Sequence, residues 1–259
     1  MARVRLDSLL AERGLYESRT RAAAAVIAGQ VHLGPGRRRA EKPGQLVDAE
    51  VEVEVAAPPP YVSRGGVKLA NALDALGLDP RERQALDVGA STGGFTDCLL
   101  QRGARHVIAL DVAYGELDYR LREDARVTVI ERTNARAVTL DQLPYRPDLI
   151  VIDVSFISLR KVLPAVLATT ADRFDCLAMV KPQFEVGRER VGKGGVVRDP
   201  SVRREALGAV AEAGRVSGAA VCGFAPSGLP GPAGNRETFV WFAEGTRACA
   251  EVDLEAVDV

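Results

Sequence analysis

The glycine-rich stretch LDVGASTGGF, residues 86–95, constrains the fold of this chain more than any other feature. A short apolar run leads into it and a helical pattern begins at Thr96, so the order is strand, tight turn, helix. Glycine lets the backbone turn sharply and approach a ligand closely, and the new helix offers unpaired N–H groups. In open α/β sheets, such turns at the carboxyl ends of strands bind nucleotides. The stretch predicts a nucleotide-like ligand, although a turn of this kind can also be only a tight connection.

The glycine spacing discriminates between ligands. Gly89, Gly93 and Gly94 follow a G-x-x-x-G-G pattern, which differs from the G-x-G-x-x-G fingerprint of dinucleotide sites. Asp87 lies two residues before the first glycine, and a carboxylate there suits a cationic ligand better than a pyrophosphate. The amino and sulfonium groups of S-adenosylmethionine meet this requirement. We predict that it binds through Asp87, Gly89, Ser91, Gly93, Gly94, Phe95, Asp111 and Asn134.

These residues have different expected roles. Asp87 should face the methionine amino group, while the three glycines shape the pocket. Asp111 ends the next strand, where a carboxylate can accept hydrogen bonds from ribose hydroxyls. Asn134 is expected near the adenine. Phe95 either lines the pocket or serves as a core aromatic residue.

From residue 84 the chain alternates strand and helix patterns, as doubly wound α/β sheets do. Helical patterns are expected near 96–103, 159–167 and 201–215. The loop 187–200 has no apolar period, and we expect an acidic, frayed tail from Glu251. The predicted strands are 85–88, 106–112, 127–130, 149–152, 176–180, one near 220–222, and 238–242.

The first 57 residues differ in character. Two short helices, from Leu6 and over 19–28, precede strands at 31–33 and 51–55, with a basic loop at 34–39 between them. Residues 1–43 carry nine basic against four acidic side chains, a net charge of +5 in a chain whose total is −1. Such a local patch suits phosphate binding, although a charge run is often only a solvated face. The predicted RNA contacts are Arg5, Arg19, Arg21, Arg37, Arg38 and Arg39.

The order of features in this region, from Arg5-Leu6-Asp7 through Gly14, Ser18-Arg19 and Gly29 to the late alternating strand, resembles the small alpha-L RNA-binding domain. That resemblance implies an α+β domain that binds structured RNA. Three prolines, 58–60, then give a stiff spacer. We therefore expect an alpha-L domain at 1–57, a linker at 58–63 and a second domain at 64–259.

Composition and charge argue against several classes of protein, including metal-binding and membrane-spanning ones. The four cysteines are widely spaced, without a C-x-x-C pair, and only two histidines are present, so we expect reduced thiols and no metal site. No apolar run approaches the roughly 18 residues of a membrane span. The net charge of −1 gives no global attraction to nucleic acid. We expect a cytoplasmic, monomeric protein that does not bind membranes.

Four ionisable residues occupy strand edges or positions beside glycine turns: Lys68, Asp153, Lys181 and Glu237. Each alone would more often be a surface charge or an ion-pair partner. Together they resemble the Lys-Asp-Lys-Glu catalytic set of 2′-O-ribose methyltransferases. The segments 87–97, 153–158 and 181–185 (DVGASTGGFTD, DVSFIS and KPQFE) make the whole chain similar to the TlyA (hemolysin A) family of ribosomal RNA methyltransferases.

The resemblance implies a Rossmann-like class I methyltransferase domain, FtsJ-like, with a seven-stranded sheet and helices on both faces. It also implies S-adenosylmethionine-dependent 2′-O-methylation of cytidine in 16S or 23S ribosomal RNA, or both, with ribosomal RNA or subunits as partners. The family linker resembles Arg-Ala-Trp-Val, whereas residues 59–62 here are Pro-Pro-Tyr-Val. A linker arginine is therefore absent, although Tyr61 can replace the aromatic residue.

The chemistry explains the residue types. A ribose 2′-hydroxyl is a poor acid, and lysine can take its proton only in the neutral form, which burial and a neighbouring cation favour. We assign Lys181 as the base or hydroxyl-positioning group and Lys68 as the second cation. Asp153 and Glu237 orient the two lysines. Proximity of the hydroxyl and the methyl group contributes most of the acceleration.

Three alternatives remain at the level of sequence. An NAD-dependent oxidoreductase conflicts with the glycine spacing. An RNA-binding assembly factor with a vestigial methyltransferase fold would not need two lysines and two carboxylates in one pocket. A membrane-active hemolysin lacks a spanning or strongly amphipathic segment.

Overall fold

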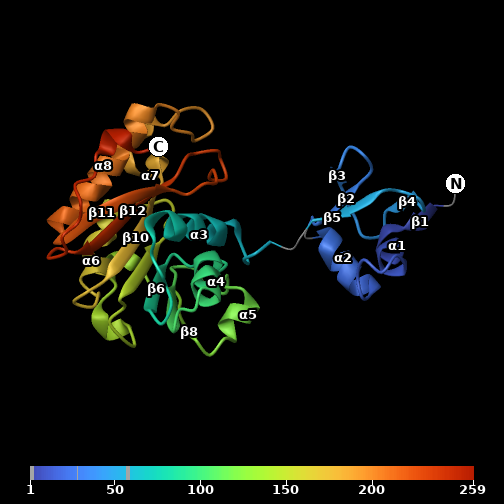
Figure 1. Ribbon diagram of the computed structural model, residues 1–259, viewed down its shortest axis with the longest axis horizontal. Helices are drawn as coiled ribbons and strands as arrows, with labels where there is room; N and C mark the ends of the chain where they lie inside the picture. The colour runs from blue at the N-terminus through green and yellow to red at the C-terminus, as the bar shows by residue number, and fades with distance from the viewer. Residues whose placement is uncertain (1–2, 28, 57–58) are drawn as a thin grey trace. The chain divides into compact units, whose positions relative to one another are not determined.

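The computed structural model describes residues 3–27, 29–56 and 59–259 (Figure 1). The chain divides into two compact units, Met1–Pro59 and Pro60–Val259.

The first unit is a small α+β fold around one core. It contains two sheets, β1–β4 and β3–β2–β5, all of whose pairs are antiparallel. Its largest fully buried side chains are Leu6 and Leu10. Its elements are β1 (Arg3–Arg5), α1 (Leu6–Glu12), α2 (Arg19–Ile27), β2 (Val31–Leu33), β3 (Arg38–Arg39), β4 (Leu46–Asp48) and β5 (Val53–Val55).

Three of these strands were not expected. β1, β3 and β4 have only two or three residues each, and two of them consist largely of arginine, so no apolar alternation marks them. Arg38 and Arg39 therefore belong to a hairpin strand opposite β2, and only the turn before them is a loop. The expected end of the second helix, Ala28, and the predicted boundary at 57–58 lie outside the described residues.

The second unit confirms the α/β prediction. Its seven-stranded sheet has the order β11-β12-β10-β9-β6-β7-β8, and β12 is antiparallel to both of its neighbours. The strands are β6 (Gln84–Val88), β7 (His106–Leu110), β8 (Val127–Ile130), β9 (Leu149–Ile152), β10 (Asp175–Val180), β11 (Ala219–Pro226) and β12 (Thr238–Glu244). The helices are α3 (Arg64–Leu76), α4 (Gly94–Gln101), α5 (Tyr119–Arg122), α6 (Leu163–Leu167), α7 (Pro182–Glu185) and α8 (Pro200–Val216).

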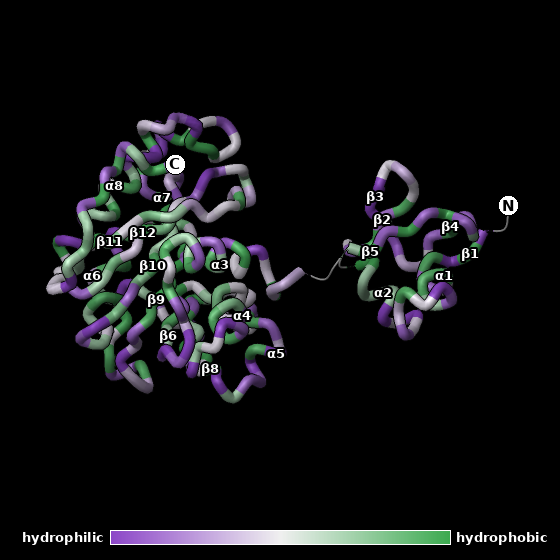
Figure 2. Tube along the Cα trace, viewed as in Figure 1, coloured by the Kyte–Doolittle hydropathy of each residue, from purple (hydrophilic) through white to green (hydrophobic). Residues whose placement is uncertain are grey.

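Successive strand residues point to opposite faces, so the sheet supports two cores. On one face, Leu86 and Val88 pack in a cluster that includes residues of α6 and α8. On the other face, Ala85 belongs to a cluster that includes residues of α3 and α4. Figure 2 shows hydrophobic residues along the sheet strands and mostly hydrophilic residues in the outer turns. Helices on both faces leave the strand ends as the accessible edge of the sheet.

Two segments expected to be irregular are held in place. The loop 187–200 contains a 3₁₀ turn at Arg188–Arg190 and a bridge between Gly192 and Val196. The tail forms a 3₁₀ turn at Leu254–Ala256, and the Arg203 guanidinium donates to the backbone oxygen of Val259 at 2.9 Å. Packing and arginine contacts order both segments, and neither leaves a periodic pattern in the sequence.

The expectation of four reduced cysteines needs correction. A β-bulge between Val221 and Gly223 interrupts β11, and Cys222 in this bulge forms a disulfide with Cys249 beyond β12. The thiols of Cys98 and Cys176 are free and buried. Burial raises the pKa of the Cys98 thiol to about 11.

Candidate active site

The sheet register brings the four predicted catalytic residues to one edge. Ile152 pairs with Val88 and with Ala178, so Asp153 follows β9 next to the glycine turn and next to the end of β10. Val180 pairs with Thr238 across the antiparallel strands, so Lys181 and Glu237 are the next residues on either side. Helix α3 supplies Lys68 to the same place, because its amine contacts Glu237.

These residues form two lysine–carboxylate pairs. Lys68 Nζ donates to Glu237 Oε2 at 2.5 Å, and their side chains are only 9% and 1% exposed. Lys181 Nζ lies 2.5 Å from Asp153 Oδ1 and donates to the Ser155 hydroxyl at 2.8 Å. Pairing offsets the cost of burying these charges and fixes each ammonium group in one position. The Oε1 atom of Glu237 is buried and has no hydrogen-bond partner.

A cavity of about 470 Å³ lies beside the second pair. Its walls include four of the predicted cofactor residues: Gly89, Ser91, Asp111 and Asn134. Asp153 and Ser155 also line it, so the cavity and the Lys181 pair share a wall. A cofactor in this cavity would lie next to the candidate catalytic residues.

The glycine turn explains how the cavity forms. Gly89 has φ +84°, and a Cβ atom there would lie 2.4 Å from the backbone oxygen of Asp153. At Gly94, a Cβ atom would lie 2.1 Å from the Ser63 hydroxyl, just before α3. The glycines thus allow β9 and the start of α3 to pack directly against the turn.

Two predicted cofactor residues lie behind the cavity wall. Asp87 is fully buried, and its Oδ2 accepts a hydrogen bond from Thr96 at 2.7 Å while Oδ1 has no partner. Burial raises the pKa of this carboxyl to about 7.

Phe95 is buried against Phe239, with ring centroids 5.9 Å apart, so it takes the core position that was one of its two expected roles. Gly93 and Gly94, which begin α4, also shape the turn without lining the cavity.

Asp111 and Asn134 are already partly engaged. The two oxygens of Asp111 accept from the backbone N–H groups of Ser91 and Ala113, both at 2.8 Å. Asn134 uses its Oδ1 to cap the 3₁₀ turn at Ala135–Ala137. Each carboxylate oxygen has a second lone pair, so Asp111 can still accept bonds from a ligand.

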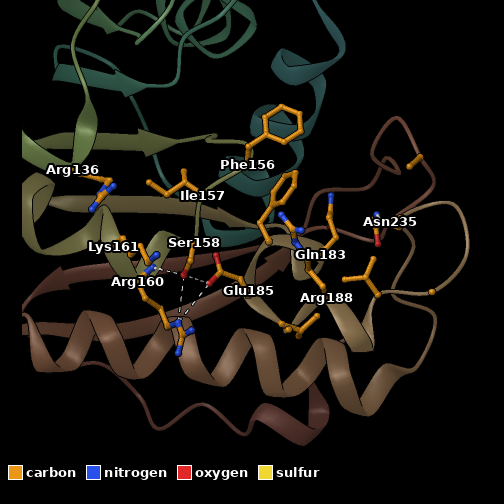
Figure 3. Close-up of a pocket in the computed structure, with 17 residues that line it drawn as sticks. Arg136, Phe156, Ile157, Ser158, Arg160, Lys161, Gln183, Glu185, Arg188 and Asn235 are labelled. Atoms are coloured by element: carbon orange, nitrogen blue, oxygen red, sulfur yellow. Dashed lines mark hydrogen bonds and ion pairs between the residues drawn. The ribbon is translucent and has the colours of Figure 1, made fainter.

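A larger cavity of about 1030 Å³ shares Phe156 and Ile157 with the first (Figure 3). The basic side chains on its walls are Arg136, Arg160, Lys161 and Arg188. Phe156 is 91% exposed with φ +64°, and its ring lies 5.3 Å from that of Phe184. Phe156 and Phe184 belong to the segments that carry the family resemblance, but the sequence alone assigned these two rings no role.

The Glu185 side chain links the segment after β10 to the segment after β9 at the base of this cavity. It accepts from the Ser158 hydroxyl at 2.6 Å (Figure 3). It also accepts from the Leu159 backbone N–H at 2.7 Å. Burial raises the pKa of the Glu185 carboxyl. The chain after β9 and the chain after β10 are therefore connected twice, once by Lys181 and once by Glu185.

Three of the six predicted RNA contacts in the first unit lie beside two carboxylates. Arg5 donates to Asp7 at 2.7 Å and Arg19 lies 3.7 Å from it, and the Arg5 guanidinium holds the pKa of Asp7 at about 2. Arg37 pairs with Glu54 at 2.7 Å. Arg21, Arg38 and Arg39 are exposed, although Arg39 also donates to the carbonyl of Ile27 at 3.4 Å.

The end of the predicted linker, from Pro60, belongs to the second unit and packs within it. The Val62 backbone N–H donates to Asp97 at 2.8 Å, and Gln101 donates to the carbonyl of Pro60 at the same distance. The Tyr61 ring lies against Gly66, where a Cβ atom would come within 2.4 Å of it. Tyr61 therefore contacts α3 and takes no part in the cavity wall.

Comparison with known proteins decides the family. Residues 61–244 match the FtsJ-like methyltransferase family. The chain is 46% identical over 256 residues to the 16S/23S rRNA (cytidine-2′-O)-methyltransferase TlyA of Mycobacterium tuberculosis, which covers 98% of this chain and 95% of that protein. The chain is a member of the TlyA family of FtsJ-like methyltransferases.

Further comparisons extend the similarity to two proteins named as hemolysins and to a more distant methyltransferase fold. Hemolysin A of Brachyspira hyodysenteriae is 40% identical and covers 79% of this chain and 85% of its own length. A solved structure from Streptococcus thermophilus, named as a candidate hemolysin, is 38% identical with a TM-score of 0.74 and covers 97% of this chain and 92% of its own. An S-adenosylmethionine-dependent methyltransferase from Mesorhizobium loti is 14% identical with a TM-score of 0.52, which shows the shared fold.

The described residues offer neither a metal cluster nor a membrane-spanning helix. No group of three or more metal-ligating side chains is present among them. Within the same ranges, no helix has both the length and the apolar character needed to cross a membrane.

Proposed function

We propose that this chain transfers a methyl group from S-adenosylmethionine to the 2′-hydroxyl of a cytidine ribose in ribosomal RNA. The observation that carries the proposal is the pair of lysine–carboxylate contacts, Lys181 with Asp153 and Lys68 with Glu237, at one sheet edge. A cavity bounded by the glycine turn adjoins them. A binding protein would gain nothing from burying two such pairs beside a ligand pocket.

The residues present fit S-adenosylmethionine. Asp87 lies behind the cavity wall and keeps one carboxylate oxygen without a partner, and a cationic amino group bound at the turn would favour the ionised form of this carboxyl. Gly89 provides the space for close backbone approach, and Asp111 and Asn134 line the part of the cavity that suits a ribose and a base. When bound there, S-adenosylmethionine supplies an electrophilic methyl group for an oxygen nucleophile.

The four catalytic candidates then have separate tasks. Lys181 in its neutral form accepts the proton that the 2′-hydroxyl loses, and Asp153 holds its amine in place. Lys68 adds a positive charge that stabilises negative charge on the ribose oxygen. Glu237 holds Lys68 and takes no proton.

Several features support an RNA substrate. The M. tuberculosis relative is named for cytidine in 16S and 23S rRNA. We assign residues 1–57 as the alpha-L RNA-binding domain and 58–63 as the linker to the methyltransferase domain, 64–259. Within the methyltransferase domain, the basic lining of the larger cavity suits a phosphate backbone, and exposed Phe156 offers a ring for base stacking. Such an enzyme would act in the cytoplasm.

The test is incubation of the purified protein and methyl-labelled S-adenosylmethionine with each ribosomal subunit lacking ribose methylation. Label recovered in an alkali-stable 2′-O-methylated dinucleotide would support the proposal and identify the subunit. Label on a base would retain the methyltransferase but contradict the catalytic assignment. No label despite cofactor binding would contradict the proposed substrate and favour an assembly role.

A further inference from the structure

Two oxygen atoms hold the amine of Lys181, and the resemblance to 2′-O-methyltransferases accounts for only one of them. Asp153 Oδ1 lies 2.5 Å from Nζ, and Ser155 Oγ accepts a hydrogen bond from Nζ at 2.8 Å. We propose that Ser155 is a positioning residue that orients the Lys181 amine toward the ribose 2′-hydroxyl. This inference rests on the proposed function.

The tetrahedral geometry of the amine gives the reason. Nζ has four directions, and its bond to Cε occupies one. The hydrogen bond to Ser155 occupies a second direction and so fixes the rotation of the amine about the Cε–Nζ bond, which sets the direction of the lone pair of the neutral amine. Asp153 Oδ1 is a close ion-pair partner but makes no hydrogen bond to the amine. With Asp153 alone, the amine could rotate about the Cε–Nζ bond and the lone pair would have no fixed direction. Proton transfer needs donor and acceptor in hydrogen-bond reach and alignment, so fixing this direction should raise the rate of the chemical step.

The position of Ser155 agrees with this role. Ser155 is exposed and lines the cavity that we assign to the cofactor, as does Asp153. Lys181 itself is nearly buried, with a side chain 12% exposed. Ser155 therefore contacts the Lys181 amine where the protein interior borders the cavity that would hold the methyl group of the cofactor. Its hydroxyl can accept from the amine and still donate to solvent or to a ligand.

The loop that carries Ser155 is held at both ends. Asp153 N–H donates to the carbonyl of Val88 at 2.9 Å, which fixes the start of the loop beside the glycine turn. Glu185 holds the other end through Ser158 and Leu159. A site works best when neighbouring contacts lock the positions of its side chains, and this loop meets that condition before any ligand binds.

The test compares Ser155→Ala and Ser155→Thr with the wild type in methyl transfer to ribosomal RNA. Ser155→Ala should lower kcat by about tenfold or more, with the KM for RNA unchanged. The cofactor Kd, measured by calorimetry without RNA, should stay within about twofold. Ser155→Thr keeps the hydroxyl and should restore most of kcat. Ser217→Ala, which removes a hydroxyl that donates to the carbonyl of Ala213, is the matched control.

Each other outcome has a definite meaning. Wild-type kcat in Ser155→Ala, or a Ser155→Thr variant as slow as Ser155→Ala, would overturn the inference. A weaker cofactor Kd with unchanged kcat would make Ser155 a cofactor contact and would also overturn it. A wild-type protein that binds cofactor but methylates no ribose would instead overturn the proposed function, and this inference with it.

Discussion

At the scale of single residues, the site depends on how each ionisable group is paired. Lys181 and Lys68 each contact one carboxylate, whereas Asp87 keeps an oxygen without a partner in a fully buried position. Sequence reasoning found all three because each lies beside a strand end or a glycine turn. It gave no role to Ser155 or Glu185, because their partners come from another strand end and only the register reveals the contact.

Lys181→Ala should lower kcat at least about a hundredfold, because the hydroxyl proton loses its acceptor. Cofactor affinity should stay within a few-fold of wild type. Lys181→Arg separates a base from a simple cation, since arginine keeps the charge but cannot act as a base at neutral pH. Both variants should be inactive in single-turnover assays; an active Lys181→Arg enzyme would contradict the assignment of Lys181 as base.

Asp87 should make stability depend on pH. Its pKa is raised by burial to about 7 in the folded protein, so between about pH 4 and pH 7 the unfolded chain releases this proton while the folded chain keeps it. The stability that Asp87 contributes is therefore complete below about pH 4 and falls as the pH rises toward 7. Asp87→Asn lacks this dependence and can still accept from Thr96.

Urea denaturation at several pH values measures this effect. The free energy of unfolding of Asp87→Asn minus that of the wild type should increase between about pH 4 and pH 7 and then level off. A difference that stays constant over this range would show that Asp87 ionises normally in the folded protein.

At the scale of elements, long apolar strands were predictable and short polar ones were not. The predicted bounds of β8 and β9 match the structure, because four consecutive apolar or β-branched residues stand between turn signals. The helix expected over 159–167 is instead a 3₁₀ turn, Leu159–Lys161, followed by α6, with Pro164 in its first turn. Proline cannot continue the hydrogen-bond ladder of a preceding helix, and the apolar pattern alone does not show this break.

The Glu185 contact should stabilise two elements together. Glu185→Ala removes the acceptor for Ser158 and Leu159, and the Leu159 N–H is left without a partner in a buried position. We expect a loss of about 1–3 kcal/mol in the free energy of unfolding. Glu185→Gln keeps one acceptor oxygen and should lose less. Equal stability of all three proteins in chemical denaturation would show that the contact does not hold the loop.

At the scale of the whole molecule, positive charge is concentrated in the part of the first unit that precedes residue 44, and the acidic residues 48–54 offset most of it within the same unit. The balance over residues 1–43 is +5, while the chain as a whole has −1. The structure adds that the six predicted RNA contacts, although all exposed, are not equivalent: Arg5, Arg19 and Arg37 lie close to carboxylates, whereas Arg21 and Arg38 have no ion pair within the described residues. A count of charged residues in the sequence does not reveal which arginines are paired with carboxylates.

Replacing Arg37, Arg38 and Arg39 together with alanine should weaken RNA binding and flatten its dependence on salt, because fewer counterions are released. The logarithmic salt slope should fall by about one for each phosphate group that the variant no longer neutralises. Cofactor affinity should not change. Arg215→Ala in α8, an exposed arginine of the other unit, is the control. An unchanged slope in the triple variant would make these residues a solvated face.

The placement of β12 has a consequence for biosynthesis. β12 is the last strand along the chain, yet it lies between β10 and β11, and it is the strand that β11 pairs with in the described sheet. A nascent chain that has emerged only to residue 237 can form the parallel strands, but β11 then has no partner and β10 presents an open edge. Open edges promote association with other chains. Translation of Thr238–Glu244 therefore covers the edge of β10, gives β11 its partner and, in the same step, secures Glu237 against Lys68, so a chain released early would be both inactive and prone to aggregate.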